Sequence, residues 1–306
     1  MAEPEPLDDR DLCPGCSAPG AGSLLDLPFD GPPVAGYLDR FYAGGLGGWL
    51  PPGSRFDLRR CVRCALVYQR YAPGPALLDH LYGRAAVAVP AEVAARRGLD
   101  TRLAYAGQIA TALRWLGTAP AATPVLDFGA GVGLWLDMAA ALGCPATGCE
   151  LDADLRDRIA ALGHPAVALD DLPDAAFAFV NAEQVLEHLV HPAEVLARLA
   201  RAVRPGGLVR LAVPDGTGVA ARLDRIRWDV PKDHPDSPNP VAPLEHLNCF
   251  DGPALDEIGR RAGLRPVVPP VRAVLWRGGR PREVADAVRA RLRPGRGLRW
   301  FVRPVR

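Results

Sequence analysis

"VLDFGAGVG", residues 125–133, joins the end of an apolar strand to a glycine-rich turn and the start of a helix. The strand pattern ends at Asp127 and Phe128, and three glycines follow at alternate positions. Glycine tolerates positive φ and lets a ligand approach the backbone, while the N–H groups of a helix start point into the space beyond the strand. In doubly wound sheets, ligands bind in this crevice at the carboxyl ends of the strands. The turn therefore predicts a ligand site.

Acidic residues around the turn indicate the kind of ligand. A dinucleotide fingerprint needs a small residue three positions after Gly131, where Leu134 stands. Asp127 precedes the first glycine by two positions, which disfavours a pyrophosphate and suits a cationic group. Glu150 ends the next predicted strand, where a carboxylate can accept both hydroxyls of a ribose. These features favour a ligand with an amino group and a ribose.

Beyond the turn, short apolar runs alternate with helical segments. This alternation is typical of a parallel sheet that is covered by helices, and it predicts an α/β fold with a doubly wound sheet. Strands are expected at residues 124–128, 146–151, 166–169, 176–180 and 208–214, and helices at 133–143, 153–163, 193–203 and 253–263. A Pro- and Asp-rich segment at 216–250 reads as an insertion over the site.

The third predicted strand leads into Asp170, Asp171 and Leu172, a polar edge with an apolar cover that suits an adenine ring. A carboxylate for an amino group, a carboxylate for a ribose and a site for an adenine ring together match the parts of S-adenosylmethionine. At this point the chain resembles the class I S-adenosylmethionine-dependent methyltransferases over roughly residues 120–270. The motifs that carry the resemblance are "VLDFGAGVG", "GCELD", "VLEHLVHPAEVLARLARAVRPGGLVRLAVPD" and "PLEHLNCFDGPALDEIGRRAGL".

The resemblance implies a seven-stranded Rossmann-like methyltransferase sheet and assigns the parts of the cofactor to particular residues. Asp127 and the glycine turn would hold the methionine part, Glu150 the ribose, and Asp170 or Asp171 the adenine. The full set of expected cofactor-binding residues is Asp127, Gly129, Ala130, Gly131, Gly133, Glu150, Leu151, Asp170, Asp171, Leu172 and Asn181.

Two Cys-x-x-Cys pairs precede the methyltransferase-like region. Cys13 and Cys16 form the first pair, and Cys61 and Cys64 form the second after a gap of 44 residues. Two intervening residues let both sulfurs of a pair reach one tetrahedral ion, and metal binding would supply folding energy to a stretch with little core of its own. The region is similar to an N-terminal zinc-binding module found ahead of some sugar and small-molecule methyltransferases. We predict a structural zinc ion on the four cysteines; unpaired structural cysteines are the alternative.

Two histidines are candidates for the chemistry of methyl transfer. His188 follows Glu187 after the fourth strand, and His246 follows Glu245 before the last helix. In sugar C-methyltransferases, which this chain resembles, a Glu-His pair before the last helix acts on the sugar, so Glu245, His246 and His188 are expected to be catalytic. The alternative is that each histidine braces a loop. Similar quinone O-methyltransferases bind a divalent ion at the segment after strand four, but Gln184 replaces one of the acids here, so a second metal is not expected.

Composition places the chain among ordinary globular proteins. The chain has 306 residues, is 49% hydrophobic and 23% charged, and has no run of eighteen apolar residues, so a membrane span is not expected. The acidic start "MAEPEPLDDRD" lacks the features of a secretory signal. Seven cysteines, an odd number, suit a reducing compartment. We therefore expect a cytoplasmic protein.

Domain boundaries follow from these patterns. We predict a zinc-binding module at 1–80, a helical connector at 81–119, a methyltransferase domain at 120–276 with its insertion at 216–250, and a basic tail at 277–306. Residues 271–306 contain eleven Arg, although the whole chain carries a net charge of only +1. This tail would suit an anionic partner.

A small-molecule acceptor, such as a sugar nucleotide or a natural-product intermediate, is the expected substrate. The alternatives are an RNA methyltransferase, in which Trp300 and Phe301 of the tail stack on bases, and a non-catalytic scaffold that binds S-adenosylmethionine. Nucleic acid is the less favoured substrate because the first 270 residues, zinc module included, carry net negative charge.

Overall fold

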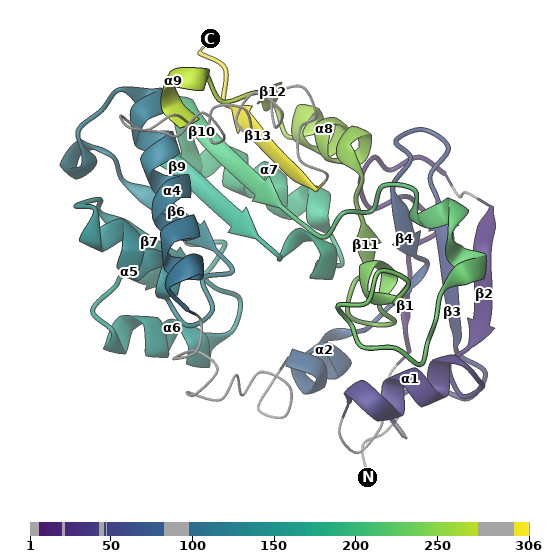
Figure 1. The fold of residues 1–306 in the computed structure, drawn as a ribbon. Helices are drawn as coiled ribbons and strands as arrows, with labels where there is room; N and C mark the ends of the chain where they lie inside the picture. Colours follow the sequence, from purple (N-terminus) through teal and green to yellow (C-terminus); the bar gives the residue numbers. More distant parts are fainter. Residues whose placement is uncertain are drawn as a thin grey trace. The chain divides into compact units, whose positions relative to one another are not determined.

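The structure is a computed structural model that describes residues 6–19, 22–42, 46, 48–82, 98–274 and 297–305 (Figure 1). The chain forms two compact units, and each is described by itself. The first unit comprises Met1–Ala91, Leu186–Pro192 and Pro214–Ala254, and the second comprises Glu92–Val185, Ala193–Val213 and Leu255–Arg306. Among the described helices, none combines the length and the apolar character needed to cross a membrane.

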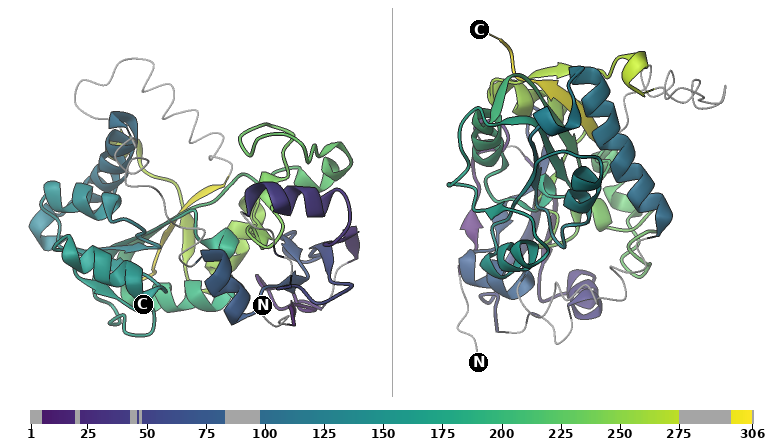
Figure 2. Two further views of the ribbon diagram at one scale, coloured as in Figure 1. Left: turned by 90° about the horizontal axis from the view of Figure 1, so that it is seen from below. Right: turned by 90° about the vertical axis from the view of Figure 1, so that its left-hand side faces the viewer.

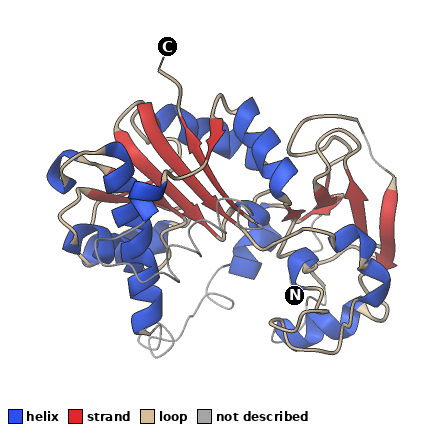
Figure 3. Ribbon diagram, turned by 45° about the horizontal axis from the view of Figure 1, so that its top comes forward, coloured by secondary structure: helices blue, strands red, loops and turns tan. Residues whose placement is uncertain are grey.

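A seven-stranded sheet is the centre of the second unit, with the strand order β12-β13-β10-β9-β6-β7-β8 (Figure 3). Its central pairs, from β10 to β8, are parallel, whereas β13 runs antiparallel to both β10 and β12. The predicted fold class is therefore confirmed. The strands are β6 (Val125–Phe128), β7 (Ala146–Cys149), β8 (Ala166–Val167), β9 (Phe177–Glu183), β10 (Val203–Ala212), β12 (Arg265–Val267) and β13 (Leu298–Val302).

Helices cover both faces of this sheet, as two turned views show (Figure 2). Trp300 on β13 joins the core that α4 and α5 build on one face, whereas its neighbour Phe301 lies against Gly259 of α8 on the other. Successive side chains of a strand point to opposite faces, so these contacts place the helices in two layers. The helices are α4 (Leu99–Leu116), α5 (Leu134–Ala141), α6 (Ala153–Ala161), α7 (Pro192–Ala202), α8 (Gly252–Arg261), α9 (Val271–Val274) and the short η1 (Pro120–Ala122).

The end of the chain differs from the predicted basic tail at 277–306. Leu298–Val302 forms β13, which pairs with β10 along Leu208–Ala212. The physical reason lies in "LRWFV". Arg299 donates a hydrogen bond to Asp256 at 3.0 Å, while Trp300 and Phe301 are buried. The part of the predicted tail at 277–296 lies outside the described residues.

The first unit contains a four-stranded antiparallel sheet of order β11-β4-β3-β2, and a second small sheet of β1 and β5. The last strand of the larger sheet, β11, comes from the end of the predicted insertion rather than from the N-terminal region. The strands are β1 (Asp8–Asp9), β2 (Ser23–Pro28), β3 (Arg55–Arg60), β4 (Val67–Gln69), β5 (Tyr71–Ala72) and β11 (Asn248–Cys249). The helices are α1 (Val34–Phe41), α2 (Pro75–Tyr82), η2 (Leu186–His188), η3 (Val219–Ala221), η4 (Leu223–Arg225) and η5 (Asn239–Val241).

Residues of the predicted insertion complete the core of the first unit. Trp228 packs edge-on against Tyr37 and Phe56, with ring centroids 5.9 and 6.0 Å away. Val241 and Leu244 are fully buried in the same core. The segment at 216–250 is therefore part of the first unit, although the sequence placed it in the methyltransferase domain. The reason is that the N-terminal region alone has too few apolar residues to close its core.

Candidate functional site

The glycine turn after β6 adopts the backbone that its sequence predicts. Gly129, Gly131 and Gly133 have φ values of +75°, +53° and +77°, in the left-handed region that favours glycine. A Cβ atom at Gly129 would lie 2.3 Å from a methyl group of Val185, so this position also requires a bare backbone for packing. A Cβ at Gly131 would meet no atom within 4 Å. The turn is therefore tight on one side and leaves space for a ligand at Gly131.

Glu150 lies against this turn. Glu150 is the first residue after β7, and its Oε1 accepts a hydrogen bond from the backbone N–H of Gly131 at 2.5 Å. The side chain is largely buried, and burial raises the pKa of its carboxyl group. The structure thus brings together two groups that the sequence assigned to one cofactor, the glycine turn and the acid after the second strand.

Asp127 is buried at the end of β6, with 5% of its surface exposed. Its Oδ1 accepts a hydrogen bond from the side-chain amide of Asn181 at 2.8 Å. Burial raises the pKa of Asp127 to about 8, against the opposing effect of that hydrogen bond. Within the described part of the chain, Asp127 has no ion pair, so a bound cation would stabilise its ionised form.

A chain of polar contacts that the sequence analysis missed holds Asn181 in place. Arg210 donates to Asn181 Oδ1 at 2.9 Å and to Glu183 at 2.8 Å. Gln108 donates to the same Glu183 carboxylate and accepts from the indole N–H of Trp135. One signal was present in the sequence: Arg210 interrupts an otherwise apolar strand, and a buried cation requires partners.

The remaining predicted cofactor residues lie in the loops that follow the strands. Leu151 is exposed, whereas Ala130 is buried within the glycine turn. Asp170 and Asp171 are exposed in the turn after β8, and Leu172 beside them is buried. The guanidinium group of Arg198 binds the carbonyl of Leu172 and the side chain of Asp174 and so fixes this turn.

In the first unit, the four cysteines of the two Cys-x-x-Cys pairs lie together and are buried. Each pair sits on a tight turn, and the residue after its second cysteine, Ser17 or Ala65, has a positive φ of 55° or 62°. In each turn this residue donates its N–H to the carbonyl of the first cysteine, Cys13 or Cys61. The two pairs therefore form matching knuckles.

The sulfur atoms fit a tetrahedral zinc ion. Cys13 Sγ lies 3.5 Å from Cys64 Sγ, and Cys16 Sγ lies 3.5 Å from Cys61 Sγ. All four atoms lie within 4.8 Å of one another. Zinc–sulfur bonds of about 2.3 Å in a tetrahedron place sulfurs about 3.8 Å apart, and four thiolates form a closed structural site.

The two candidate histidines, His188 and His246, also lie together in the first unit. Their rings are 4.8 Å apart and nearly perpendicular. Burial and the neighbouring His246 lower the pKa of His188 to about 4, and burial lowers the pKa of His246 as well. Glu187 completes this cluster, with its Oε1 at 3.8 Å from His188 Nε2, and burial raises its pKa to about 8. Both imidazoles are therefore neutral near pH 7.

The carboxylate of Glu245 has partners on two other residues, Lys232 and Tyr42. It binds the ammonium group of Lys232, the only lysine of the chain, at 2.5 Å and the hydroxyl group of Tyr42 at 3.3 Å. Burial opposes ionisation of Glu245, but the bond and charge of Lys232 outweigh it, so the pKa is lowered. His246 Nδ1 instead bonds the backbone carbonyl of Asn239.

Two buried polar side chains of the N-terminal region hold the loop that carries His246. Gln69 donates to the carbonyls of Ala242 and His246 at 2.8 and 3.0 Å, and it accepts from the N–H of Leu244 at 3.0 Å. Arg10 donates to the backbone carbonyl of Leu247 at 2.8 Å and to the backbone carbonyl of Gln69 at 3.0 Å. Leu244 has a positive φ of 63°, an unfavourable backbone for leucine that these bonds maintain. These contacts of Arg10 and Gln69 were not predicted from the sequence.

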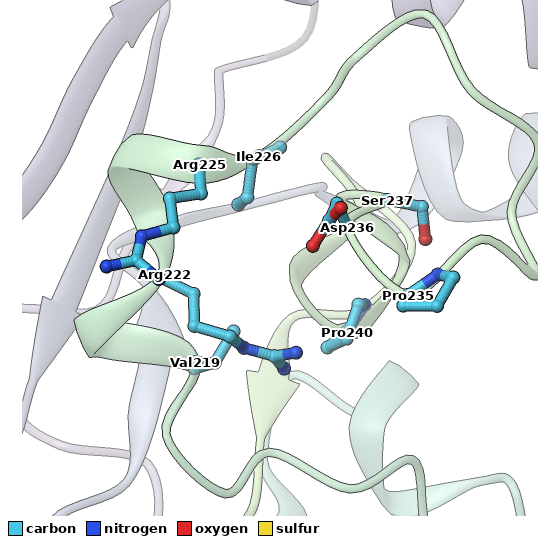
Figure 4. A pocket seen from close by; sticks show the side chains of 8 residues that line it. All are labelled: Val219, Arg222, Arg225, Ile226, Pro235, Asp236, Ser237 and Pro240. Carbon is cyan, nitrogen blue, oxygen red and sulfur yellow. The ribbon is translucent and has the colours of Figure 1, made fainter.

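A small pocket elsewhere in the first unit contains none of the residues that the sequence singled out. Its walls come from the turns η3 and η4 and from the loop before η5, and arginine side chains border it (Figure 4). The lining residues are Val219, Arg222, Arg225, Ile226, Pro235, Asp236, Ser237 and Pro240. The lining thus includes two arginines and one aspartate.

Comparison with known proteins agrees with this geometry. Residues 99–268, more than half of the chain, match the methyltransferase domain family Methyltransf_23. A ubiquinone biosynthesis O-methyltransferase of Idiomarina loihiensis is 28% identical over 152 residues, which cover 44% of this chain and 62% of that protein. The chain thus spans less than two thirds of the length of this curated relative.

Solved structures with a similar fold include an S-adenosylmethionine-dependent methyltransferase from Mesorhizobium loti, with 14% identity, a TM-score of 0.40 and coverage of 61% of this chain and 93% of that one. Another is the phosphoethanolamine N-methyltransferase 2 of Haemonchus contortus in complex with phosphomonomethylethanolamine and S-adenosylhomocysteine, with 15% identity, a TM-score of 0.42 and coverage of 68% and 53%. By the match of its residues 99–268, the chain belongs to the class I S-adenosylmethionine-dependent methyltransferases.

Proposed function

We propose that this protein transfers a methyl group from S-adenosylmethionine to a small-molecule acceptor. The observation that carries the proposal is the contact between Glu150 and the N–H of Gly131, with Asp127 buried at the end of the preceding strand. It gathers two carboxyl groups and an open glycine backbone at the carboxyl ends of adjacent parallel strands, β6 and β7. This is the place where doubly wound sheets bind ligands.

Each group has a part of the cofactor to hold. Asp127 would accept the ammonium group of the methionine part, which gives its buried carboxyl group the cation that it lacks. Glu150 would accept the ribose hydroxyls, and Gly131 would let the backbone approach the ligand. The turn of Asp170, Asp171 and Leu172 would hold the adenine. When bound, the cofactor supplies a methyl group on a sulfonium ion that a nucleophile displaces in line.

The acceptor would use the histidine cluster of the first unit. A hydroxyl or carbon nucleophile must lose a proton during transfer, and His246 is proposed as the base or the group that orients the acceptor. Its neutral imidazole carries a proton on Nδ1, which faces the carbonyl of Asn239, so Nε2 has a lone pair for the acceptor. His188, whose ring lies beside that of His246, is also proposed to be catalytic.

The placement of the aromatic residues near the C-terminus supports a small molecule over a nucleic acid. Trp300 is 7% exposed and stacks on Phe179, with ring centroids 5.5 Å apart. Phe301 is completely buried. Neither ring is available to stack on bases, so the RNA interpretation loses the residues that it relied on.

Mass spectrometry tests this function. The purified protein is incubated with S-adenosylmethionine that carries a labelled methyl group and with a metabolite extract of the host. We expect a labelled product that Glu150→Ala fails to form. Transfer of label to RNA, with no labelled small molecule, would overturn the proposed acceptor class while leaving the methyltransferase activity intact.

A further inference from the structure

Arg210 is a buried cation on the sheet of the second unit. It is 6% exposed and lies on β10, in register with Asn181 on β9, which in turn lies in register with Asp127 on β6. Residues two positions earlier in a strand share a face with these three, and here they are apolar: Val125, Phe179 and Leu208. A polar row therefore follows the apolar core at the carboxyl ends of the strands, where ligands bind.

The contacts along this row fix the orientation of the amide group of Asn181. Arg210 Nη1 donates to Asn181 Oδ1 at 2.9 Å, and Asn181 Nδ2 donates to Asp127 Oδ1 at 2.8 Å. A guanidinium group only donates, so it selects the orientation in which the amide oxygen faces Arg210 and the amide nitrogen faces Asp127. The opposite orientation would place an oxygen against a carboxylate and a donor against a cation. Arg210 thus decides which group Asn181 presents to Asp127.

Two further side chains hold Arg210 in this position. Glu183 Oε2 accepts from Arg210 Nη1 at 2.8 Å and from Gln108 Nε2 at 2.9 Å, and Gln108 Oε1 accepts from the indole N–H of Trp135 at 3.0 Å. A buried ion pair contributes little more to stability than apolar residues of similar volume would. Stability alone therefore does not account for a cation in this row.

The row acts on the carboxylate of Asp127. Among the described residues, Asn181 is the one donor to this carboxylate, and it bonds Oδ1. A donor on one oxygen favours the ionised form and holds the group in place, which leaves Oδ2 for a ligand. Burial raises the pKa of Asp127, whereas the bond from Asn181 and the charge of Arg210 lower it. Arg210 therefore favours a negative charge at Asp127 both through Asn181 and by its own charge.

We propose that Arg210 is a positioning residue for the amino-acid end of the cofactor: it orients Asn181, which holds Asp127 towards the ammonium group. Arg210 itself touches no part of the ligand. The inference rests on the proposed function and deepens it, because it states how the site distinguishes a nucleoside that carries an ammonium group from one that does not. The row supports only this end of the ligand, and Glu150 serves the ribose.

Two probes separate the ends of the ligand in a calorimeter. S-Adenosylhomocysteine and 5′-methylthioadenosine share the adenine, the ribose and an uncharged sulfur, but only the first has an ammonium group. We expect Arg210→Met to bind S-adenosylhomocysteine about tenfold more weakly than wild type, the loss typical of one hydrogen bond to a charged group. Its affinity for 5′-methylthioadenosine should stay unchanged. A purely structural role of Arg210 would weaken both ligands alike.

A double-variant comparison tests whether Arg210 acts through Asn181. Asn181→Ala should lose the preference for S-adenosylhomocysteine to a similar extent, and the double variant should lose no more than Asn181→Ala alone. Thermal melting shows whether each variant is folded. If Arg210→Met does not fold, Asn181→Ala carries the test by itself, because an unchanged preference in that variant overturns the proposal.

Two controls give the comparison its meaning. Glu150→Ala should weaken both ligands by the same factor, since both contain the ribose. Arg303→Met removes another arginine of the second unit, one that donates to the backbone carbonyls of Arg201 and Val203, and should leave both affinities unchanged.

The outcomes separate this inference from the proposed function. Wild-type protein that binds neither ligand overturns the cofactor site and the role of Arg210 with it. Wild-type protein that prefers S-adenosylhomocysteine, with the same preference in Arg210→Met and Asn181→Ala, overturns the role of Arg210 alone. Additive losses in the double variant also overturn it, since Arg210 then does not act through Asn181.

Discussion

The side-chain amide of Gln69 donates a hydrogen bond to the backbone carbonyl of His246 at 3.0 Å. Gln69 is the last residue of β4, and the second cysteine pair lies just before that strand. The same amide also bonds Ala242 and Leu244, so one buried side chain satisfies three backbone groups of the loop that carries the histidine. The sheet that starts at the cysteine cluster thus supports the candidate acceptor site.

Substitution of Gln69 should therefore damage the histidine loop while the cysteine cluster survives. Gln69→Ala removes the bonds to the carbonyl of His246 and the N–H of Leu244, and each such loss costs about 1–3 kcal/mol, while the carbonyl of Ala242 keeps its bonds from the N–H groups of Glu245 and His246. We expect a lower melting temperature and a reduced turnover, with one zinc ion per chain retained. Zinc analysis and a methyl-transfer assay measure the two effects. A variant with wild-type turnover would show that the loop does not need this support.

Loss of zinc should unfold the first unit. Cys61→Ser removes one of four thiolates, and a structural zinc site contributes directly to folding. We expect the variant to lose zinc and most of its soluble yield. Cys144→Ala is the control, because Cys144 is buried in the core of the second unit. We expect this variant to retain its zinc. Fully folded wild-type protein without zinc would contradict the assignment.

Much of the second unit could be predicted from the sequence because its signals are local, although β13 was assigned to a basic tail. The glycine turn and each strand around it depend on residues within a few positions of one another, and periodicity reveals them, whereas the contact of Glu150 with Gly131 joins residues 19 positions apart. The first unit was harder to predict. Trp228 and Leu244 complete its core from the far side of the sequence, and neither residue carries a local mark of that role.

The same contrast applies to the candidate sites. Cys13 and Cys61 each belong to a pair with the spacing of metal ligands, so it could be predicted that the two pairs lie together. His246 lies close to Glu187, and the carboxylate of Glu245 binds Lys232. Both contacts depend on how separate loops fold together. Such contacts leave no pattern in a single sequence.

Asp127 should make the stability of the ligand-free protein depend on pH. Its folded pKa is raised to about 8, so the folded state holds this proton more tightly than the unfolded state does. Stability from this group is therefore full below the unfolded pKa of about 4 and falls as the pH rises towards 8. Asp127→Asn removes that loss. We expect the variant to melt higher than wild type above pH 8 and the difference to shrink towards pH 4.

The variant should nevertheless bind S-adenosylmethionine more weakly, because the neutral amide of Asp127→Asn no longer attracts an ammonium group. Thermal melting across pH, with and without the cofactor, separates the two effects. A parallel pH dependence in variant and wild type would show that Asp127 is ionised in the folded protein.

Removal of His246 should affect turnover more than cofactor binding. A positioned base or orienting group typically contributes about 10²–10⁴-fold, so His246→Ala should lose activity of that order. Affinity for S-adenosylmethionine should stay close to that of wild type, because the proposed cofactor site lies in the second unit. Steady-state kinetics and calorimetry measure both, with His191→Ala as the control. Near-full activity of His246→Ala would remove the histidine from the chemistry.

Calorimetric titration with S-adenosylmethionine tests the central claim, that the glycine turn and Glu150 form the cofactor site. Wild-type protein should bind one cofactor per chain, and Glu150→Ala should bind it more weakly by about 1–3 kcal/mol, since it loses a charged hydrogen-bond acceptor. Asp152→Ala is the control, because Asp152 only caps α6 through the N–H groups of Asp154 and Leu155. Equal affinity of Glu150→Ala and wild type, or binding of NADH with none of S-adenosylmethionine, would contradict the claim.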